Sequence, residues 1–165
     1  MIRPAHPGDV PRLLALVREL AEYERALHEV QAGEADLHAA LFTPEPAVFC
    51  HVAEHEPGDG RAPEIVGFAL WFLSFSTWRG RHGVYLEDLY VRPDMRGHGY
   101  GRALLRTLAG VCVERGYQRL EWWVLDWNTS AHAFYRSVGA EPMDEWTVWR
   151  LSGPALAALG GGGGR

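Results

Sequence analysis

The segment RGHGYG at residues 96–101 constrains the fold more than any other part of the sequence. It follows an apolar, strand-like run, VYLEDLYV at 84–91, and precedes the helical pattern RALLRTLAGVCVERG at 102–116. Because glycine lacks a Cβ, successive backbone N–H groups can line a concave anion site, and the start of a helix adds partial positive charge. The sequence therefore predicts a strand, a close-approach turn and a helix in succession.

The spacing of these glycines excludes two familiar phosphate-binding loops. A dinucleotide fingerprint needs G-x-G-x-x-G, but counting from Gly97 the last glycine position is occupied by Arg102. A Walker A motif needs a lysine, and all 16 Lys and Arg residues of this chain are arginine. The absence of lysine also excludes Schiff-base catalysis. Taken alone, the loop fits a structural turn as well as it fits a pyrophosphate site.

The loop and its surroundings resemble the GCN5-related N-acetyltransferase (GNAT) family, whose acetyl-CoA loop has the pattern Q/R-x-x-G-x-G/A. Arg96, Gly99 and Gly101 match that pattern, and WWVLDWNTSAHAFYRSVGA resembles the family's next strand and helix. ELAEYE, YLEDLYV, LDWN and FYRSVGAEPMDEW are most similar to the spermidine/spermine (diamine) and thialysine N-acetyltransferases. The resemblance covers nearly the whole chain and implies an acetyl-CoA-dependent N-acetyltransferase acting on a small amine.

The resemblance and the order of the elements predict an α+β fold with α/β-type layers. We expect one domain over 1–159, with a mixed, mostly antiparallel sheet flanked by helices, and a disordered glycine-rich tail at 160–165. Asp9 is the expected N-cap of a first helix that has Pro11 in its first turn. Further helices are expected over 34–41, after the glycine loop as far as Gly116, and over 129–138, with strands at Ile2 and over 47–54, 64–75, 84–91, 118–127 and 145–151.

Composition limits the partners and the cellular compartment. A chain of 165 residues with 47% hydrophobic content is an ordered protein with a sizeable core. Its formal net charge of −5 argues against nucleic acid as a partner. No apolar run is long enough for a membrane span and no signal peptide is recognisable, so we expect a cytoplasmic protein in which Cys50 and Cys112 are reduced and buried.

Two adjacent carboxylates in the 84–91 strand are the candidates for acid–base chemistry. A primary amine is largely protonated at neutral pH, so its attack on a thioester benefits from a base, and the departing thiolate benefits from an acid. Glu87 is the candidate base. Asp88 points to the opposite face of an ideal strand, unless the β-bulge that the family carries here re-aims the side chains. The sequence leaves open which carboxylate faces the amine, and both could be solvated strand residues.

Tyr135 is the candidate acid through the resemblance only. Its helical spacing with Ala131 and Val138 favours a core position, whereas the family's proton donor to the thiolate occupies this F-Y position. The resemblance also implies a cofactor site made of strand main chain, glycine loop and the next helix. Its expected members are Leu89, Tyr90, Val91, Arg96, Gly97, His98, Gly99, Tyr100, Gly101, Arg102, Asn128 and Ser137. Asn128 is equally well explained as a helix N-cap.

The amine site is expected to be acidic. Carboxylates spaced along a groove suit a cationic acceptor, because each ammonium group needs a partner as it leaves water. The resemblance assigns this role to Tyr23, Glu24, Glu87, Asp88 and Glu145, although any single one of these acids is as well explained as surface charge. Positive charge at Arg79, Arg81 and His82 disfavours a long polyamine and favours a diamine or thialysine-like acceptor.

Several alternatives stay open at this stage. The acceptor could be another amine, such as an aminoglycoside or a protein N-terminus, or the chain could be an acyl-CoA-binding sensor without turnover. HVAEH at 51–55 matches the H-x-x-E-H zinc pattern, but in the strand expected here His51 and His55 would lie about 13 Å apart, so we expect no metal. The tryptophan-rich segments, together with the resemblance, imply a homodimer.

Overall fold

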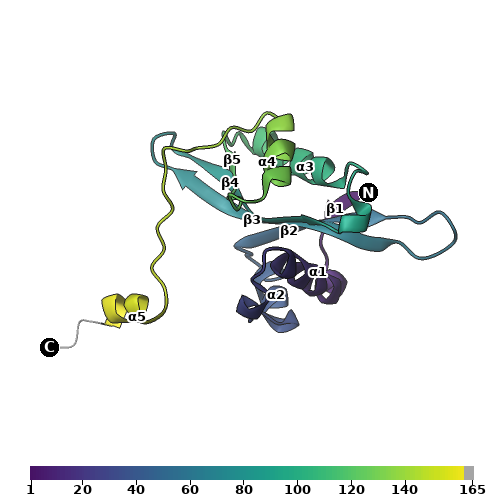
Figure 1. Ribbon diagram of the computed structural model, residues 1–165, viewed down its shortest axis with the longest axis horizontal. Helices are drawn as coiled ribbons and strands as arrows, with labels where there is room; N and C mark the ends of the chain where they lie inside the picture. Colours follow the sequence, from purple (N-terminus) through teal and green to yellow (C-terminus); the bar gives the residue numbers. More distant parts are fainter. Residues whose placement is uncertain (162–165) are drawn as a thin grey trace. The chain divides into compact units, whose positions relative to one another are not determined.

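The computed structural model describes residues 1–161, in two compact units that divide after Val124. The first unit, Met1–Val124, is built on a five-stranded sheet with the strand order β1-β2-β3-β4-β5 (Figure 1). The first four strands pair antiparallel, and β5 pairs parallel to β4. The strands are β1 Ile2–Pro4, β2 Val48–His55, β3 Glu64–Ser76, β4 Arg81–Val91 and β5 Leu120–Glu121. The expected α+β class and the mixed, mostly antiparallel sheet are therefore confirmed.

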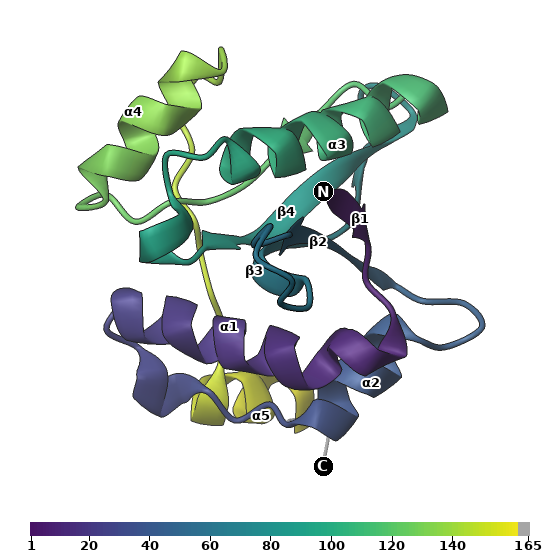
Figure 2. The same cartoon turned by 90° about the vertical axis from the view of Figure 1, so that its right-hand side faces the viewer.

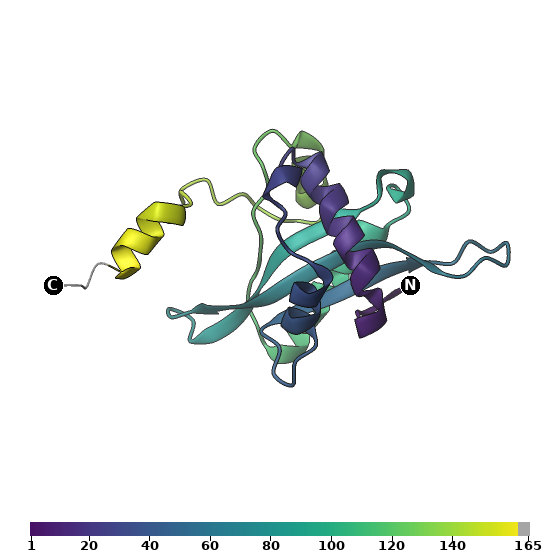
Figure 3. The ribbon, with the colours of Figure 1, turned by 90° about the horizontal axis from the view of Figure 1, so that it is seen from below.

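Helices cover both faces of this sheet (Figure 2). Helices α1 (Val10–Tyr23) and α2 (Glu34–Leu41) lie on one face, where Figure 3 shows them from below, and α3 (Tyr100–Arg115) lies on the other. Short 3-10 turns are η1 (Pro7–Asp9), η2 (Leu27–Glu29) and η3 (Pro93–Met95). The second unit contains α4 (Thr129–Ser137) and α5 (Gly153–Gly161). None of the helices within residues 1–161 is long and apolar enough to cross a bilayer.

The side chains that α1 and α2 bury against the sheet hold the first unit together. One apolar cluster joins α1, α2 and three strands through Leu13, Leu16, Leu41, Cys50, Val52, Ile65, Phe68 and Tyr90. Burying one such large side chain stabilises a fold by about 1.5–3 kcal/mol. Cys50 and the other cysteine, Cys112, are buried free thiols, as expected. This cluster fixes α1 over β3 and β4, and so sets the position of the end of α1 relative to the sheet.

Asp9 occupies the expected N-cap position of α1, but its carboxylate does not cap the helix. It accepts hydrogen bonds from Nη1 and Nη2 of Arg3, at 2.7 and 3.1 Å, and from the backbone N–H of His6. Burial alone would raise the pKa of Asp9, but these hydrogen bonds lower it overall. Arg3 also donates to Glu54, so this ion-pair network ties β1, the start of α1 and β2 together.

One of the expected strands is shorter than predicted and another is absent from the described residues. The strand expected over 118–127 is reduced to Leu120–Glu121, because only Val84 and Tyr85 of β4 pair with it. The strand expected over 145–151 is absent, since residues 140–152 are irregular in the described part of the second unit. An apolar segment becomes a strand only where a neighbouring strand satisfies its backbone groups. The helix α5 was not expected, and it includes the first two residues of the glycine-rich tail; residues 162–165 lie outside the described part.

Candidate active site

A β-bulge in the middle of β4 places the two candidate carboxylates. Asp88 pairs with Leu70 of β3 while Leu86 pairs with Trp71, so Glu87 is the extra residue of the bulge. Side chains of paired residues share a face of the sheet. Leu70 packs against the α1 cluster, and Asp88 therefore faces α1. The bulge that the resemblance implies is present.

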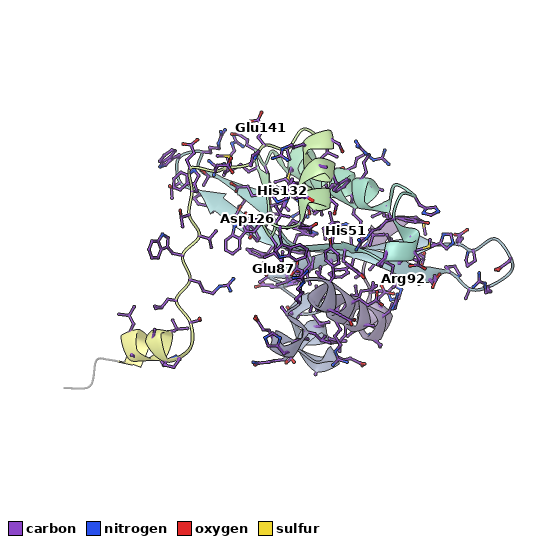
Figure 4. All side chains as sticks on the ribbon, in the orientation of Figure 1. His51, Glu87, Arg92, Asp126, His132 and Glu141 are labelled. Carbon is purple, nitrogen blue, oxygen red and sulfur yellow. The ribbon has the colours of Figure 1, made fainter. Side chains whose placement is uncertain are left out.

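Glu87 lies on the same side of the sheet as Asp88. Tyr85 pairs with Phe72, which shares the face of Leu70, and alternation along β4 then returns Glu87 to that face. In an ideal strand, two consecutive side chains point to opposite faces of the sheet, and the bulge places these two on the same face. Glu87 is exposed and lies near the middle of the sheet (Figure 4). Both carboxylates therefore lie on the α1 face, and which of them faces the amine is not decided by the fold.

Burial and neighbouring charge change the acidity of this region. Burial, reinforced by the negative charges of Glu87 and Glu24, raises the pKa of Asp88 to about 7. Burial also raises the pKa of Glu24, which follows directly after the last residue of α1. The three carboxylates form a negative site at the end of α1 and the middle of β4. An ammonium group would relieve their mutual repulsion, so the site is suited to a protonated amine.

The glycine loop has the geometry that an anion site requires. Gly97 and Gly99 have φ values of 81° and 84°, a left-handed conformation that favours glycine. Gly99 is the N-cap of α3, whose first turn contains no acidic residue. No heavy atom from elsewhere in the described chain lies within 4 Å of a Cβ built on either glycine, so the backbone is open to approach. The loop and the helix start together fit a pyrophosphate group.

Two side chains connect the loop to other elements. Arg96 turns away from the loop: its guanidinium lies 5.1 Å from the ring centroid of Tyr23 and 5.8 Å from that of Tyr90, and its Nε donates to the carbonyl oxygen of Val91 at 3.0 Å. Tyr100, at the start of α3, shares a 2.8 Å hydrogen bond with Nδ1 of His55. Arg96 therefore connects the loop to Tyr23 at the end of α1. Its side chain is engaged there, and the expected cofactor contact of Arg96 stays a prediction.

The edge of β4 that faces β5 is open along most of its length. Only Val84 and Tyr85 pair with β5, so Leu86–Val91 has no strand partner on this edge among the described residues. Such an edge presents backbone N–H and C=O groups that an extended, amide-containing ligand can pair with. The expected main-chain contacts of Leu89, Tyr90 and Val91 would be made here. The short turn η3 joins this open edge to the glycine loop, so an extended ligand can contact both.

Four of the predicted site residues belong to the second unit. Asn128 is the N-cap of α4: its side-chain oxygen accepts from the backbone N–H of Ala131 and from Ser130 Oγ. Tyr135 lies on α4 beside Phe134, and Ser137 Oγ donates to the carbonyl oxygen of Phe134. Glu145 is exposed in the irregular segment that follows. The capping role considered for Asn128 is confirmed; its cofactor contact and the roles of Tyr135, Ser137 and Glu145 remain predictions.

The histidines of HVAEH have structural partners within the sheet. His51 Nδ1 accepts from Nε1 of Trp71 at 3.1 Å, and burial lowers the pKa of His51. His55 binds Tyr100, as described above. Both lie on β2, as the strand assignment predicted, and residues 1–161 contain no cluster of three potential metal ligands. Sequence reasoning missed the contacts that hold Arg96 and Tyr100, because nothing in the sequence links residue 100 to residue 55.

Comparison with known proteins agrees with this geometry. The model of the acetyltransferase (GNAT) family matches residues 13–140. A thialysine N-epsilon-acetyltransferase of Bos taurus is 41% identical over 98% of this chain and 97% of its own length. An L-ornithine N5-acetyltransferase of Arabidopsis thaliana is 31% identical, over 96% of this chain and 86% of its own.

Solved structures show the same fold. An integron cassette protein from the mobile metagenome of V. cholerae superposes with a TM-score of 0.77 and 27% identity, covering 97% of this chain and 96% of that one. The family model extends over the strand with the bulge, the glycine loop and the helix that carries Tyr135. The chain belongs to the acetyltransferase (GNAT) family and is an N-acetyltransferase, with acetyl-CoA as the co-substrate that this family implies.

Proposed function

We propose that this enzyme acetylates a primary amine of a small diamine or a thialysine-like amino acid by direct transfer from acetyl-CoA. The observation that carries the proposal is the pair of carboxylates at the bulge, both on the α1 face of the strand that leads into the glycine loop. With Glu24 they form a negative site for a cationic acceptor. The open edge of β4 and the left-handed glycines fit the pantetheine and pyrophosphate parts of the co-substrate.

The relatives support a small acceptor. The names of the bovine and plant proteins specify acetylation of a side-chain amine of an amino acid. Such an acceptor carries one reactive ammonium group, which three carboxylates can accommodate. A long polyamine would need further acidic residues along its length. The positive residues of the β3–β4 turn, Arg79 and Arg81, do not supply them.

In the proposed reaction Glu87 takes the proton from the ammonium group, directly or through water, because it is the exposed carboxylate of the pair. The freed amine attacks the thioester carbonyl and a C–N bond forms. The nitrogen then gives its second proton to solvent, and the C–S bond breaks. Tyr135 donates its phenolic proton to the departing sulfur and regains one from solvent. Asp88 and Glu24 attract the ammonium group, and Tyr23 and Glu145 border it. Asn128 and Ser137 contact the co-substrate in this proposal.

Release of free CoA thiol tests the activity. Thialysine, ornithine, lysine, putrescine and spermidine are offered separately with acetyl-CoA. We expect fastest release with a diamino acid or diamine, and a loss of at least about tenfold in kcat for Tyr135→Phe. Tyr117→Phe, two residues beyond the end of α3, is the matched control and should retain activity. Thiol release that is equal in Tyr135→Phe and the wild type would refute the role of Tyr135, and preference for an aminoglycoside or a peptide N-terminus would refute the substrate class.

We further propose that the enzyme is a cytoplasmic homodimer. Exposed aromatic side chains in the second unit support an interface, with Trp146 71% and Trp149 91% exposed. Light scattering coupled to size-exclusion chromatography measures the mass directly. A mass of about twice the 18.4 kDa of the chain supports the dimer, and a monomer at micromolar concentration contradicts it.

A further inference from the structure

The turn between β3 and β4 carries a group of arginines that the proposed reaction does not use. A surface pocket at this end of the sheet is lined by Ser74, Phe75, Ser76, Arg79, Arg81, His82, Gly83, Gln118, Arg119 and Glu121. Three guanidinium groups thus meet one carboxylate in a chain whose net charge is −5. We propose that this pocket binds a small, multiply charged oxyanion, a phosphate or carboxylate compound, at a site separate from the co-substrate.

The arginines of the pocket lack the close acidic partners that several other arginines of the described chain have. Arg3, Arg12 and Arg92 each have a carboxylate oxygen within 3.1 Å. In the pocket, Arg119 reaches Glu121 only at 3.8 Å, and neither Arg79 nor Arg81 forms an ion pair within residues 1–161. Excess positive charge held together in this way is relieved by an anion, and guanidinium groups bind carboxylate and phosphate oxygens through paired hydrogen bonds.

The walls of the pocket are held in place by neighbouring contacts. Arg79 Nη1 donates to Gln118 Oε1 at 2.6 Å, which joins the β3–β4 turn to the segment before β5. His82 Nδ1 donates to the carbonyl oxygen of Ser74 at 3.1 Å, and its ring meets the ring of Tyr117 edge-on. The lining residues therefore come from β3, the β3–β4 turn, β4 and the chain at the start of β5. A site built across segments can hold donors at a fixed spacing, which a single mobile side chain cannot.

The pocket is distinct from the co-substrate site. It lies at the start of β4, whereas the glycine loop follows the end of β4 (Figure 1). Arg81 and Glu87 are separated by about 20 Å at the usual rise of a strand. An acceptor amino acid bound at Glu87 is too short for its own carboxylate to reach Arg81. The anion is therefore a second ligand, and the two sites can be filled together.

Calorimetric titration tests the site while the glycine loop is kept occupied. Wild type, Arg81→Gln, Arg119→Gln and the control Arg18→Gln, an exposed arginine of α1, are each saturated with CoA and titrated with pyrophosphate or citrate. We expect wild type and Arg18→Gln to bind at least one anion alike, and the two pocket variants to bind at least about tenfold more weakly, as the loss of a charge-assisted hydrogen bond predicts.

Each outcome decides the question. Binding of pyrophosphate alone identifies a phosphate compound as the ligand, and binding of citrate alone identifies a carboxylate. Binding that CoA abolishes, or that both pocket variants retain, would overturn the proposal, as would no binding at millimolar anion. Circular dichroism shows whether each variant is folded. If one of the two pocket variants is unfolded, the other one still tests the site. Thiol release is measured in parallel, so failure of the anion site is separate from failure of the proposed acetyl transfer.

Discussion

Replacing Asp88 by asparagine should make the protein more stable at alkaline pH and leave its stability unchanged in acid. In the folded protein burial raises the pKa of Asp88 from 3.8 to about 7. A carboxyl group whose pKa is raised on folding holds its proton more tightly in the folded state. Wild-type stability therefore falls as the pH rises from about 4 to about 7, and stays at the lower value above that range. Asparagine does not ionise in this pH range, so the stability of the variant does not fall in this way.

The size of the stability gain follows from the difference between the pKa of Asp88 in the folded protein and its ordinary value. One pKa unit corresponds to about 1.4 kcal/mol, so a rise from 3.8 to about 7 corresponds to about 4 kcal/mol if none of the charge is screened. Water can approach Asp88, which is only partly buried, and this reduces the value. We expect Asp88→Asn to exceed wild type by about 2–4 kcal/mol at pH 8 and by less than about 0.5 kcal/mol at pH 4.

Urea unfolding followed by tryptophan fluorescence at pH 4, 6 and 8 measures this difference. Glu87→Gln is measured beside Asp88→Asn. It removes the adjacent, exposed carboxylate, whose charge only reinforces the effect of burial on Asp88, so its gain in stability at pH 8 should be the smaller of the two. A gain for Asp88→Asn that is the same at all three pH values would show that charge burial is not its cause. A loss of stability at pH 8 would show that the ionised carboxylate is satisfied in the fold, and would refute the reasoning. The activities of the two variants separate their roles, since we expect Glu87→Gln to lose kcat.

Three further perturbations test other parts of the structure. Gly67→Ala should cost about 1–3 kcal/mol in urea unfolding, because the added Cβ would lie 2.6 Å from the carbonyl oxygen of Tyr90; an unchanged midpoint would contradict that close approach. Arg25 has a φ of 61° at the end of α1, so Arg25→Gly should be more stable than Arg25→Ala by about 1 kcal/mol, and equal stabilities would argue against backbone strain. Arg96→Gln should raise the KM for acetyl-CoA several-fold and lower stability by about 1 kcal/mol, while Arg18→Gln changes neither; an unaffected KM would show that the contact with Tyr23 does not position the loop.

The local sequence pattern was sufficient to predict several helices, strands and turns. The helix over 34–41 has the bounds that its spacing predicts, and the β2–β3 hairpin and the C-cap at Gly116 were likewise predictable. Pattern failed over 118–127 and 145–151, two segments in which tryptophan and other apolar residues are frequent. Their state depends on whether a neighbouring strand accepts their backbone hydrogen bonds, and this information does not lie within the segments.

The candidate site was predictable in composition but not in geometry. The glycine loop and the carboxylate pair stood out in the sequence, and their family roles followed from the resemblance. The shared face of Glu87 and Asp88 depends on the bulge, which no residue of β4 announces by itself. The raised pKa of Asp88 depends on burial and on Glu24, a residue far away in the chain. The contact of Arg96 with Tyr23 likewise joins distant segments.

The open edge of β4 has a consequence for the solubility of the protein. A strand edge with unpaired backbone groups can be extended by a strand of any neighbouring molecule, which is a common beginning of aggregation. A co-substrate lying along Leu86–Val91 would occupy those groups and block that addition. Acetyl-CoA would then protect the strand edge from aggregation as well as donate the acetyl group. Stocks of the enzyme should stay clear for longer with CoA present, and cells short of acetyl-CoA should lose the protein to precipitation sooner.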